Sequence, residues 1–585
     1  RRGQQHQLFG EGCRGHPAQV VTPTGNVTQP ALMALAAARE VTQPVFTAVL
    51  DEQWVRSALQ APYLRDNNES PLPGMAFAVK DNIDVEGVPT TGACPAITAP
   101  ALRSAAAVQR LMSAGAIPIA KTNMDQFATG LVGTRSPYGA CHSVASAAHV
   151  SGGSSSGSAV AVALGIVDLA LGTDTAGSGR VPAAFNGLVG MKPSRGLISN
   201  RGLMPASPSL DCVTTFSRTV ALARLAFETL IAPDPDDPYS RPMPTTAPEG
   251  IAERMRVIGV PSARVDLDYP HRQAWQDAVT HAATVARLVP VDVEPLLAAA
   301  RLLYTGPMIG ERLAAFGQLL ELDGPHLDPT VRQIVLGARS ATAADVYRAQ
   351  HLLAALTAQT RALFIGIDAI MLPVTPGHPT LAEVAADPTG VNSRLGTYTN
   401  MVNLLDLCAV AVPAGSRPDG LPFGVQLIAP AFADRPLLQL ASRWCDEPVP
   451  DLTLGVHREL LAVAGAHLTG QPLNAALVEL GGRLHCRART AAGYRMYAVP
   501  GPIPRPGLVR TGDGSADGIE LEIWHLPHQG LGLLVPTVTT PLSLGQIELD
   551  NGKWVTGFVG DSLRAESAQD ITSYGGWRAY LHRHE

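Results

Sequence analysis

Residues 151–196 read SGGSSSGSAVAVALGIVDLALGTDTAGSGRVPAAFNGLVGMKPSRG, and residues 78–85, upstream, read AVKDNIDV. The longer stretch alternates glycine-rich turns with short apolar runs, and it places Ser154 and Ser178 in two of those turns. Lys80 lies between apolar residues of the shorter stretch. Two serines in flexible turns and one lysine in an apolar strand are the parts needed to activate a serine nucleophile without a histidine.

The residues around these stretches predict alternating strands and helices. Continuous apolar runs predict buried strands, and apolar residues at helical spacing predict helices. The predicted strands are 74–80, 117–121, 167–171 and 421–430, and the predicted helices are 30–64, 101–116, 158–165, 437–444 and most of 270–362. Ser178 follows the end of a predicted strand, where α/β sheets place their active sites. We therefore expect an α/β fold.

Length and composition predict two domains or more. The chain has 585 residues, of which 46% are hydrophobic and 16% are charged, and this exceeds one ordinary domain. Prolines and acidic residues at 447–451 mark a linker, and short strands with Gly/Pro turns follow it. These strands are expected at 520–524, 532–537 and 554–559. The predicted organisation is a disordered leader at 1–22, a first domain at 23–448, a linker at 449–460 and a small, β-rich α+β domain at 461–585.

Composition also argues against several classes of protein. The net charge is −6 and no Lys/Arg-rich run is present, so we expect no nucleic-acid partner. The most apolar run, 159–171, contains Asp168 and is shorter than the roughly 20 residues of a membrane helix. Seven widely spaced cysteines without a C-x-x-C pair predict neither a disulfide framework nor a zinc site. We expect a cytoplasmic protein with no membrane anchor, metal or cofactor.

The residue types indicate how a serine could be activated. A lysine can take the serine proton if burial makes its charged form unfavourable and lowers its pKa. Lys80 has this apolar context, because Phe77, Val79 and Ile83 surround it in the sequence. A turn that contains glycine can also direct main-chain N–H groups at a developing oxyanion.

These motifs resemble the amidase signature family, whose members hydrolyse amides with a Ser, cis-Ser and Lys triad. Ser178 closes TDTAGS and resembles the nucleophile, Ser154 resembles the cis-peptide serine, and Lys80 resembles the base. The resemblance implies a large mixed sheet surrounded by helices, and it covers about residues 30–445. Its further motifs are AKTNMDQF (120–127), GLVGMKPSRG (187–196) and GLPFGVQLIAP (420–430). The implied oxyanion hole consists of the amides of Thr175, Ala176, Gly177 and Ser178.

Segments of the second domain resemble the C-terminal domain of the allophanate hydrolase family, which is similar in fold to γ-glutamylcyclotransferases. They are GAHLTGQPLN (465–474), PRPGLVR (504–510), EIWHLP (522–527) and PLSLGQIEL (541–549). The resemblance implies cleavage of allophanate, a small anionic amide, to ammonia and N-carboxycarbamate. The second domain would decarboxylate N-carboxycarbamate, as a step of urea degradation and in a homodimer. His467 is the catalytic candidate of this domain and Asn474 a substrate-binding candidate, and no glutamate is assigned as the catalytic acid of the cyclotransferases.

A small anion needs a cation in the first site, and an arginine fork matches a carboxylate best. Tyr304 and Arg312, in RLLYTGPMIGER, resemble the carboxylate-recognising pair of the family. In a continuous helix their spacing of eight residues is about two turns, so both would face one pocket. The alternative is that Tyr304 lies in the core and Arg312 is a solvated helix residue.

Other readings of the chain remain. A Gly/Ser stretch is most often a flexible loop, and a phosphate-binding loop would need a Gly-Lys-Ser/Thr that is absent from this stretch. An amidase of different substrate range, such as the amide-cleaving component of an amidotransferase, would use the same triad without the second domain. The most distant alternative is a non-catalytic scaffold.

Overall fold

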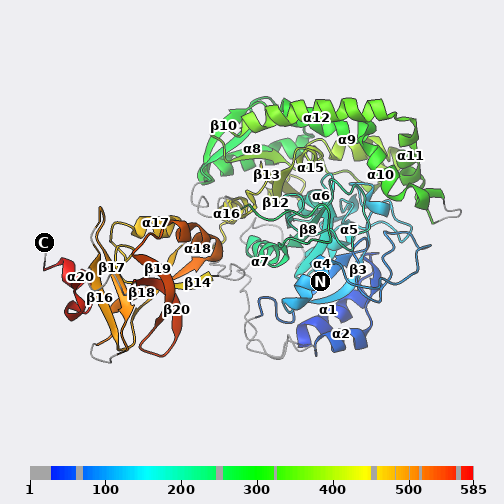
Figure 1. The fold of residues 1–585 in the computed structure, drawn as a ribbon. Coiled ribbons are helices and arrows are strands. Elements are labelled where there is room, and N and C mark those ends of the chain that lie inside the picture. Colours follow the sequence, from blue (N-terminus) through cyan, green and yellow to red (C-terminus); the bar gives the residue numbers. More distant parts are fainter. Residues whose placement is uncertain are drawn as a thin grey trace. The chain divides into compact units, whose positions relative to one another are not determined.

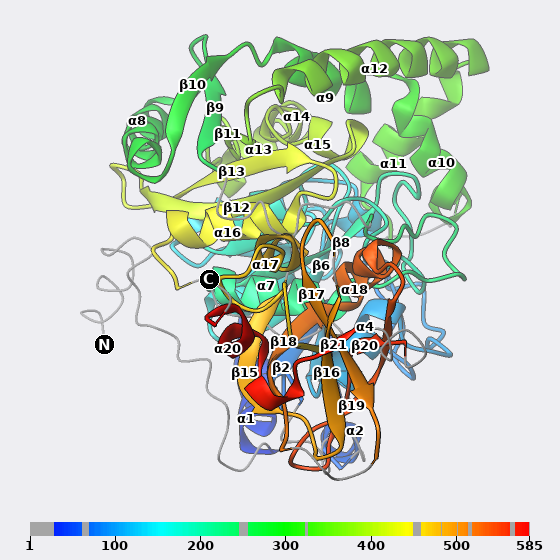
Figure 2. The same ribbon diagram turned by 60° about the vertical axis from the view of Figure 1, so that its left-hand side comes forward.

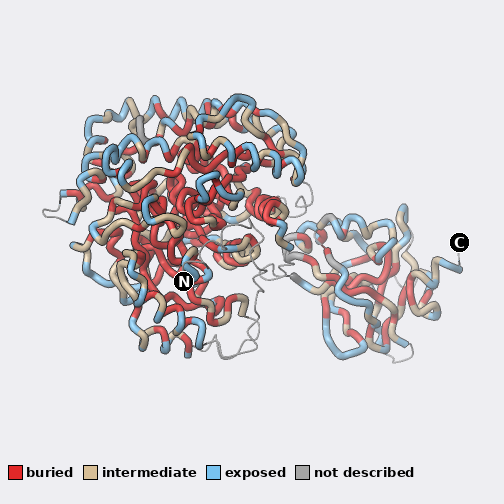
Figure 3. Tube along the Cα trace, turned by 180° about the vertical axis from the view of Figure 1, so that it is seen from behind, coloured by how far each residue is buried: buried red, intermediate tan, exposed pale blue. Residues whose placement is uncertain are grey.

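The computed structural model describes residues 28–60, 70–244, 255–321, 326–448, 458–480, 482–499, 501–512, 517–561 and 568–583. The chain divides into two compact units, Arg1–Leu454 and Gly455–Glu585, and each unit has a buried interior (Figure 1; Figure 3). The predicted leader lies outside the described residues, as does 449–457 of the predicted linker. The rest of that linker is the start of a strand, because β14 spans Arg458–Val463.

Within the described residues, the first unit contains an 11-stranded sheet. In sheet order its strands are β1 (Phe46–Val49), β3 (Ile117–Thr122), β2 (Ala76–Lys80), β6 (Leu169–Asp174), β8 (Cys212–Ser217), β7 (Val189–Lys192), β12 (Leu407–Ser416), β13 (Pro422–Pro430), β11 (Ala369–Pro373), β9 (Val257–Pro261) and β10 (Arg287–Val291). β3, β2 and β6 are mutually parallel, and so are β11, β9 and β10, whereas the strands between them pair antiparallel. The predicted α/β fold with a large mixed sheet is confirmed.

Helices cover both faces of this sheet (Figure 2). They are α1 (Thr28–Glu40), α2 (Glu52–Ala58), α4 (Ala106–Ser113), α5 (Ser156–Ala163), α6 (Arg180–Phe185), α7 (Val220–Leu230), α8 (Tyr269–Val285), α9 (Glu294–Thr305), α10 (Gly310–Phe316), α11 (Pro329–Gly337), α12 (Ala343–Leu363), α13 (Leu381–Ala386), α14 (Gly390–Leu395), α15 (Met401–Leu404) and α16 (Asp434–Trp444). Successive strand residues point to opposite faces. In β11, Met371 packs in the cluster of α7, α8 and α16, whereas Ile370 and Leu372 pack in the cluster of α9, α12 and α15.

The central strands bring the predicted site residues together. β2 and β6 pair in parallel, with Val79 opposite Leu171, so their carboxyl ends lie at the same edge of the sheet. Both strands are buried along their whole length, as expected of parallel strands with helices on both faces. Lys80 at the end of β2 therefore lies beside Thr173 near the end of β6.

Three predicted elements differ in the structure. The helix expected at 30–64 is two helices with β1 between them, and the helical region at 270–362 contains β10. The strand expected at 532–537 is helical, because α18 (His528–Leu534) runs into a 3₁₀ turn (Val535–Thr537). In all three segments short apolar runs fit either period, so the sequence pattern alone does not distinguish a strand from a helix.

The second unit contains a five-stranded and a three-stranded sheet within the described residues. In sheet order the first consists of β15 (Arg483–Arg489), β18 (Glu520–Pro527), β14 (Arg458–Val463), β20 (Trp554–Gly560) and β19 (Leu542–Glu548). The second consists of β17 (Arg505–Arg510), β16 (Tyr494–Val499) and β21 (Gln569–Asp570), and the helices are α17 (Asn474–Glu479), α18 and α20 (Trp577–Leu581). The unit is β-rich, as the sequence predicted.

Candidate active sites

Lys80 and Ser154 meet in the interior of the first unit. Lys80 Nζ lies 2.8 Å from Ser154 Oγ and 2.7 Å from Thr173 Oγ1, and it donates hydrogen bonds to both. Lys80 and Ser154 are fully buried and Ser178 is 2% exposed. The structure thus places the lysine beside a hydroxyl that could pass it a proton.

Burial lowers the pKa of Lys80 from 10.5 to about 7. Loss of hydration is the largest cause, because it disfavours the charged ammonium. The charges of Asp125, Asp211 and Asp174 act in the opposite direction, and the charge of Arg312 lowers the pKa further. A sizeable neutral fraction exists near pH 7, and this neutral form can accept a proton.

The turn that carries Ser154 is held by Asp125. The Gly153–Ser154 peptide bond is cis, and the Ser154 carbonyl accepts a hydrogen bond from the Asp125 amide at 3.0 Å. The Asp125 carboxylate in turn accepts from the amides of Gly133 at 3.0 Å and Arg135 at 2.9 Å. A Cβ at Gly153 would lie 2.1 Å from Asp125 Oδ2, so only glycine fits there.

Asp174 holds the turn that carries Ser178. It accepts from the amides of Gly177 at 2.8 Å and Gly179 at 3.1 Å. It also forms a buried ion pair with Arg180, in which two guanidinium nitrogens each lie 2.9 Å from a carboxylate oxygen. These contacts fix the backbone on both sides of Ser178.

The same contacts change the expected oxyanion hole. The Gly177 amide donates to Asp174, so it is directed into the turn and away from an incoming oxyanion, and our prediction for this amide is wrong in this structure. The amides of Thr175, Ala176 and Ser178 stay predictions. Gly177 has a φ of 128°, which glycine adopts readily.

A third carboxylate, Asp211, supports the start of this turn. Asp211 Oδ1 accepts from Thr175 Oγ1 at 2.5 Å, and Oδ2 accepts from the amides of Ala206 at 2.8 Å and Ser207 at 3.0 Å. Burial raises the pKa of Asp211. Sequence reasoning assigned no role to Asp125, Asp174 or Asp211, because the groups they bind are mostly backbone amides, which no motif reveals.

Arg312 is buried near the same centre, which rules out a solvated surface residue. It is 1% exposed, and its guanidinium donates to the Ala128 carbonyl at 3.2 Å and to Thr129 Oγ1 at 3.3 Å. Its charge influences both Lys80 and Asp211. Arg312 therefore supplies positive charge to the interior of this site.

Tyr304 and Arg312 do not share one helix. Tyr304 belongs to α9, which ends at Thr305, and a 3₁₀ turn at Pro307–Ile309 precedes α10. The Tyr304 side chain lies outside the described part of the structure. The helical-spacing argument for this pair is therefore wrong, because Gly306 and Pro307 break the helix between them.

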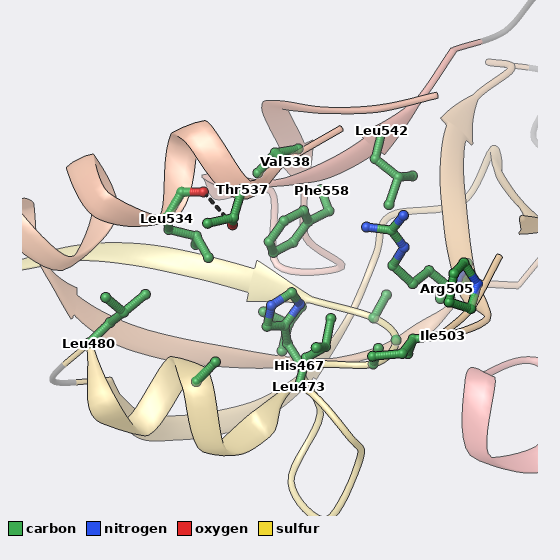
Figure 4. Close-up of a pocket in the computed structure, with 17 residues that line it drawn as sticks. His467, Leu473, Leu480, Ile503, Arg505, Leu534, Thr537, Val538, Leu542 and Phe558 are labelled. Atoms are coloured by element: carbon green, nitrogen blue, oxygen red, sulfur yellow. Dashed lines mark hydrogen bonds between the residues drawn. The ribbon is translucent and has the colours of Figure 1, made fainter. Parts of the chain in front are cut away.

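The second unit contains a cavity of about 380 Å³ (Figure 4). Its walls are mainly apolar, and its polar side chains are His467, Arg505 and Thr537. The His467 ring stacks on Phe558, with centroids 4.9 Å apart and ring planes 10° from parallel. Burial and then the charge of Arg505 lower the pKa of His467 from 6.5 to about 4, so the imidazole in this cavity is neutral at pH 7.

Asn474 has a different place from the one expected. Its side-chain amide donates to the His467 carbonyl at 2.9 Å, and it does not line the cavity. The prediction that Asn474 binds substrate does not fit this geometry. Asn474 instead holds the turn that presents His467.

Glu522 is the buried glutamate near that turn. Its carboxylate accepts from the Thr469 amide at 2.8 Å, from Thr469 Oγ1 at 3.0 Å and from Trp524 Nε1 at 3.2 Å, and it pairs with Arg578 at 2.8 Å. These bonds outweigh burial and lower its pKa. A carboxylate with so many donors holds strands and turn together, and it is a poor candidate for a catalytic acid.

The described residues were also compared with the requirements of a membrane span and a metal site. No helix among them is both long and apolar enough to cross a lipid bilayer. No group of three or more His, Cys, Asp or Glu side chains in this part of the chain is arranged to hold a metal ion.

Two family models match the chain. The Amidase model matches residues 26–438, and the model of the allophanate hydrolase C-terminal domain matches residues 459–582. The chain is 41% identical over 559 residues to urea amidolyase of Saccharomyces cerevisiae, a match that covers 88% of this chain and 30% of the relative. The chain thus spans less than a third of the length of this relative.

Solved structures are similar over both units. A variant of Kluyveromyces lactis allophanate hydrolase has 38% sequence identity and a TM-score of 0.76, and the match covers 96% of this chain and 97% of the other. A relative that matches the first unit is the A-type component of glutamyl-tRNA(Gln) amidotransferase from Haloarcula marismortui. It is 34% identical over 407 residues, which cover 64% of this chain and 96% of the relative.

Proposed function

Because the chain belongs to the amidase family, we propose that its first unit hydrolyses allophanate with a relay of Lys80, Ser154 and Ser178. The buried hydrogen bond between Lys80 and Ser154, 2.8 Å long, carries this proposal. Burial keeps part of the lysine neutral near pH 7, so a base is present where the relay needs one. The substrate assignment rests on the C-terminal family model and on the allophanate hydrolase of similar structure.

In the proposed reaction, neutral Lys80 takes a proton from Ser154 as Ser154 takes one from Ser178. Ser178 Oγ attacks the carbon of the terminal amide, and main-chain amides of the turn stabilise the oxyanion. The proton returns through the relay to the leaving nitrogen, which departs as ammonia. Water then hydrolyses the ester on Ser178, which frees the enzyme and N-carboxycarbamate.

Arg312 is proposed to hold the substrate carboxylate. It is the buried cation whose charge reaches Lys80, and a guanidinium binds a carboxylate through two parallel hydrogen bonds. A simple neutral amide offers Arg312 no such partner. This difference favours an anionic substrate over neutral amides.

The second unit is proposed to decarboxylate N-carboxycarbamate in the cavity beside His467. The product of the first reaction is a small dicarboxylate, and the cavity of about 380 Å³ has room for it. The two reactions together release ammonia and carbon dioxide and would serve the breakdown of urea. The homodimer implied by the family resemblance stays a prediction.

The test measures ammonia and CO₂ release from allophanate by the wild type and Ser178→Ala, with biuret, malonamate and simple amides as alternative substrates. The matched control is Ser207→Ala, which alters a buried serine of the neighbouring turn. We expect turnover of allophanate that Ser178→Ala abolishes and Ser207→Ala retains. Turnover of another amide in place of allophanate would keep the relay and overturn the substrate.

A further inference from the structure

The cavity of the second unit contains an arginine that the sequence motifs left without a role. Arg505 is half-buried and begins β17, and it lines the cavity together with His467. In Figure 4 the Arg505 side chain extends toward the space beside Phe558, and the His467 ring lies below the Phe558 ring. Two polar groups from separate elements thus face one apolar enclosure.

Local packing explains why these two residues share the cavity. The turn that carries His467 lies directly against β17, because a Cβ at Gly465 would be 2.0 Å from Pro506 Cδ. Only glycine allows this approach. The contact brings the residue next to Pro506, Arg505, to the wall of the cavity that His467 lines.

Arg505 also differs from other arginines of the unit in its partners. Arg495, Arg510 and Arg578 each form an ion pair with a carboxylate. Among the described residues no carboxylate pairs with Arg505, whose guanidinium reaches Thr539 Oγ1 at 3.5 Å. A half-buried guanidinium at an apolar cavity is a suitable partner for a carboxylate supplied by a ligand.

We propose that Arg505 binds one carboxylate of a small dicarboxylate in this cavity and so directs the other carboxylate toward His467 and the apolar wall. The inference rests on the proposed function, in which that dicarboxylate is N-carboxycarbamate. The bond from nitrogen to the second carboxylate carbon breaks and CO₂ leaves. The electron pair stays on nitrogen, which takes a proton from solvent by way of the His467 imidazole, and carbamate remains on Arg505.

Decarboxylation is tested in the full chain with ¹³C-labelled allophanate. Arg505→Met removes the charge at similar length, Arg505→Lys keeps the charge without the fork, and Arg510→Met is the matched control from the opposite face of the same strand. We expect normal ammonia release from all three. In Arg505→Met, N-carboxycarbamate should accumulate as decarboxylation slows by roughly 10- to 100-fold, the range for charge-assisted hydrogen bonds. Arg505→Lys should fall between Arg505→Met and the control.

A second measurement does not depend on allophanate turnover. Malonate, a stable dicarboxylate, should protect His467 of the full chain from diethyl pyrocarbonate, as read by peptide mass spectrometry, with exposed His582 as the internal control. Protection should persist in Arg510→Met and disappear in Arg505→Met. Equal protection and equal decarboxylation in Arg505→Met would overturn the role of Arg505. Arg505-dependent protection without allophanate turnover would instead overturn the proposed function and keep the dicarboxylate site.

Discussion

Lys80 and Lys121 lie on adjacent strands of the same sheet and are both fully buried, yet their surroundings differ. Lys121 pairs with the carboxylate of Asp81 at 3.2 Å and donates to Thr90 Oγ1 at 3.0 Å. Lys80 meets the hydroxyls of Ser154 and Thr173. Burial lowers the pKa of both lysines, but only Lys121 has a carboxylate at ion-pair distance. A buried lysine beside hydroxyls is suited to be a base, and one beside a carboxylate to hold structure.

Replacement of Lys80 should have the largest effect. Lys80→Met removes the base, and we expect kcat/KM for ammonia release to fall by ~10⁴-fold, the upper range of general base catalysis. The melting temperature should stay the same or rise, because a buried amine is removed. Loss of activity that merely follows a loss of folded protein would contradict the contrast with Lys121.

Lys121→Met should have the opposite pattern. It leaves the buried Asp81 carboxylate without its cation, and breaking a buried pair in this way costs about 3–5 kcal/mol of unfolding free energy. Chemical denaturation measures this loss, and the double variant Lys121→Met/Asp81→Asn should recover part of it. Activity per folded molecule should change far less than in Lys80→Met, and an equal loss would break the comparison.

Arg312→Met should weaken substrate binding and shift the pH profile. Hydrogen bonds to charged groups contribute about 1.5–3 kcal/mol, so KM for allophanate should rise roughly 10- to 100-fold. Removing the positive charge favours the protonated form of Lys80, because Arg312 lowers the pKa of Lys80. The acid limb of kcat/KM should therefore move to higher pH, and an unchanged KM would remove Arg312 from the site.

Thr173→Val should have the smallest effect and the opposite sign. The Thr173 hydroxyl accepts a hydrogen bond from Lys80 at 2.7 Å, and an accepting group stabilises the protonated amine. Its loss should move the acid limb to lower pH, with about a tenfold loss of kcat for one lost hydrogen bond. A shift to higher pH would show that Thr173 does not stabilise the ammonium form.

The motifs predicted which residues meet, because Lys80 and Ser178 each follow a strand and Ser154 lies in a glycine turn. They did not reveal Asp125 or Asp174, since a carboxylate that accepts backbone amides carries no spacing signal.

The second unit was less predictable than the first. Arg505 lies within a motif but had no predicted role, because a charged residue between prolines is typical of a surface turn. The strand expected at 532–537 is helical for a similar reason, since its short apolar run fits either structure. His467 was found from its motif, whereas its stacking on Phe558 depends on a strand 91 residues later in the chain.

The pH dependence of kcat/KM for ammonia release from allophanate tests most directly whether Lys80 acts as a neutral base. Neutral Lys80 accumulates as pH rises through its pKa of about 7. The wild type should thus show an acid limb with an apparent pKa near 7, a tenfold fall per pH unit below it and a plateau above it. A flat profile, or a limb near the ordinary lysine value of about 10.4, would contradict a neutral Lys80 as the base.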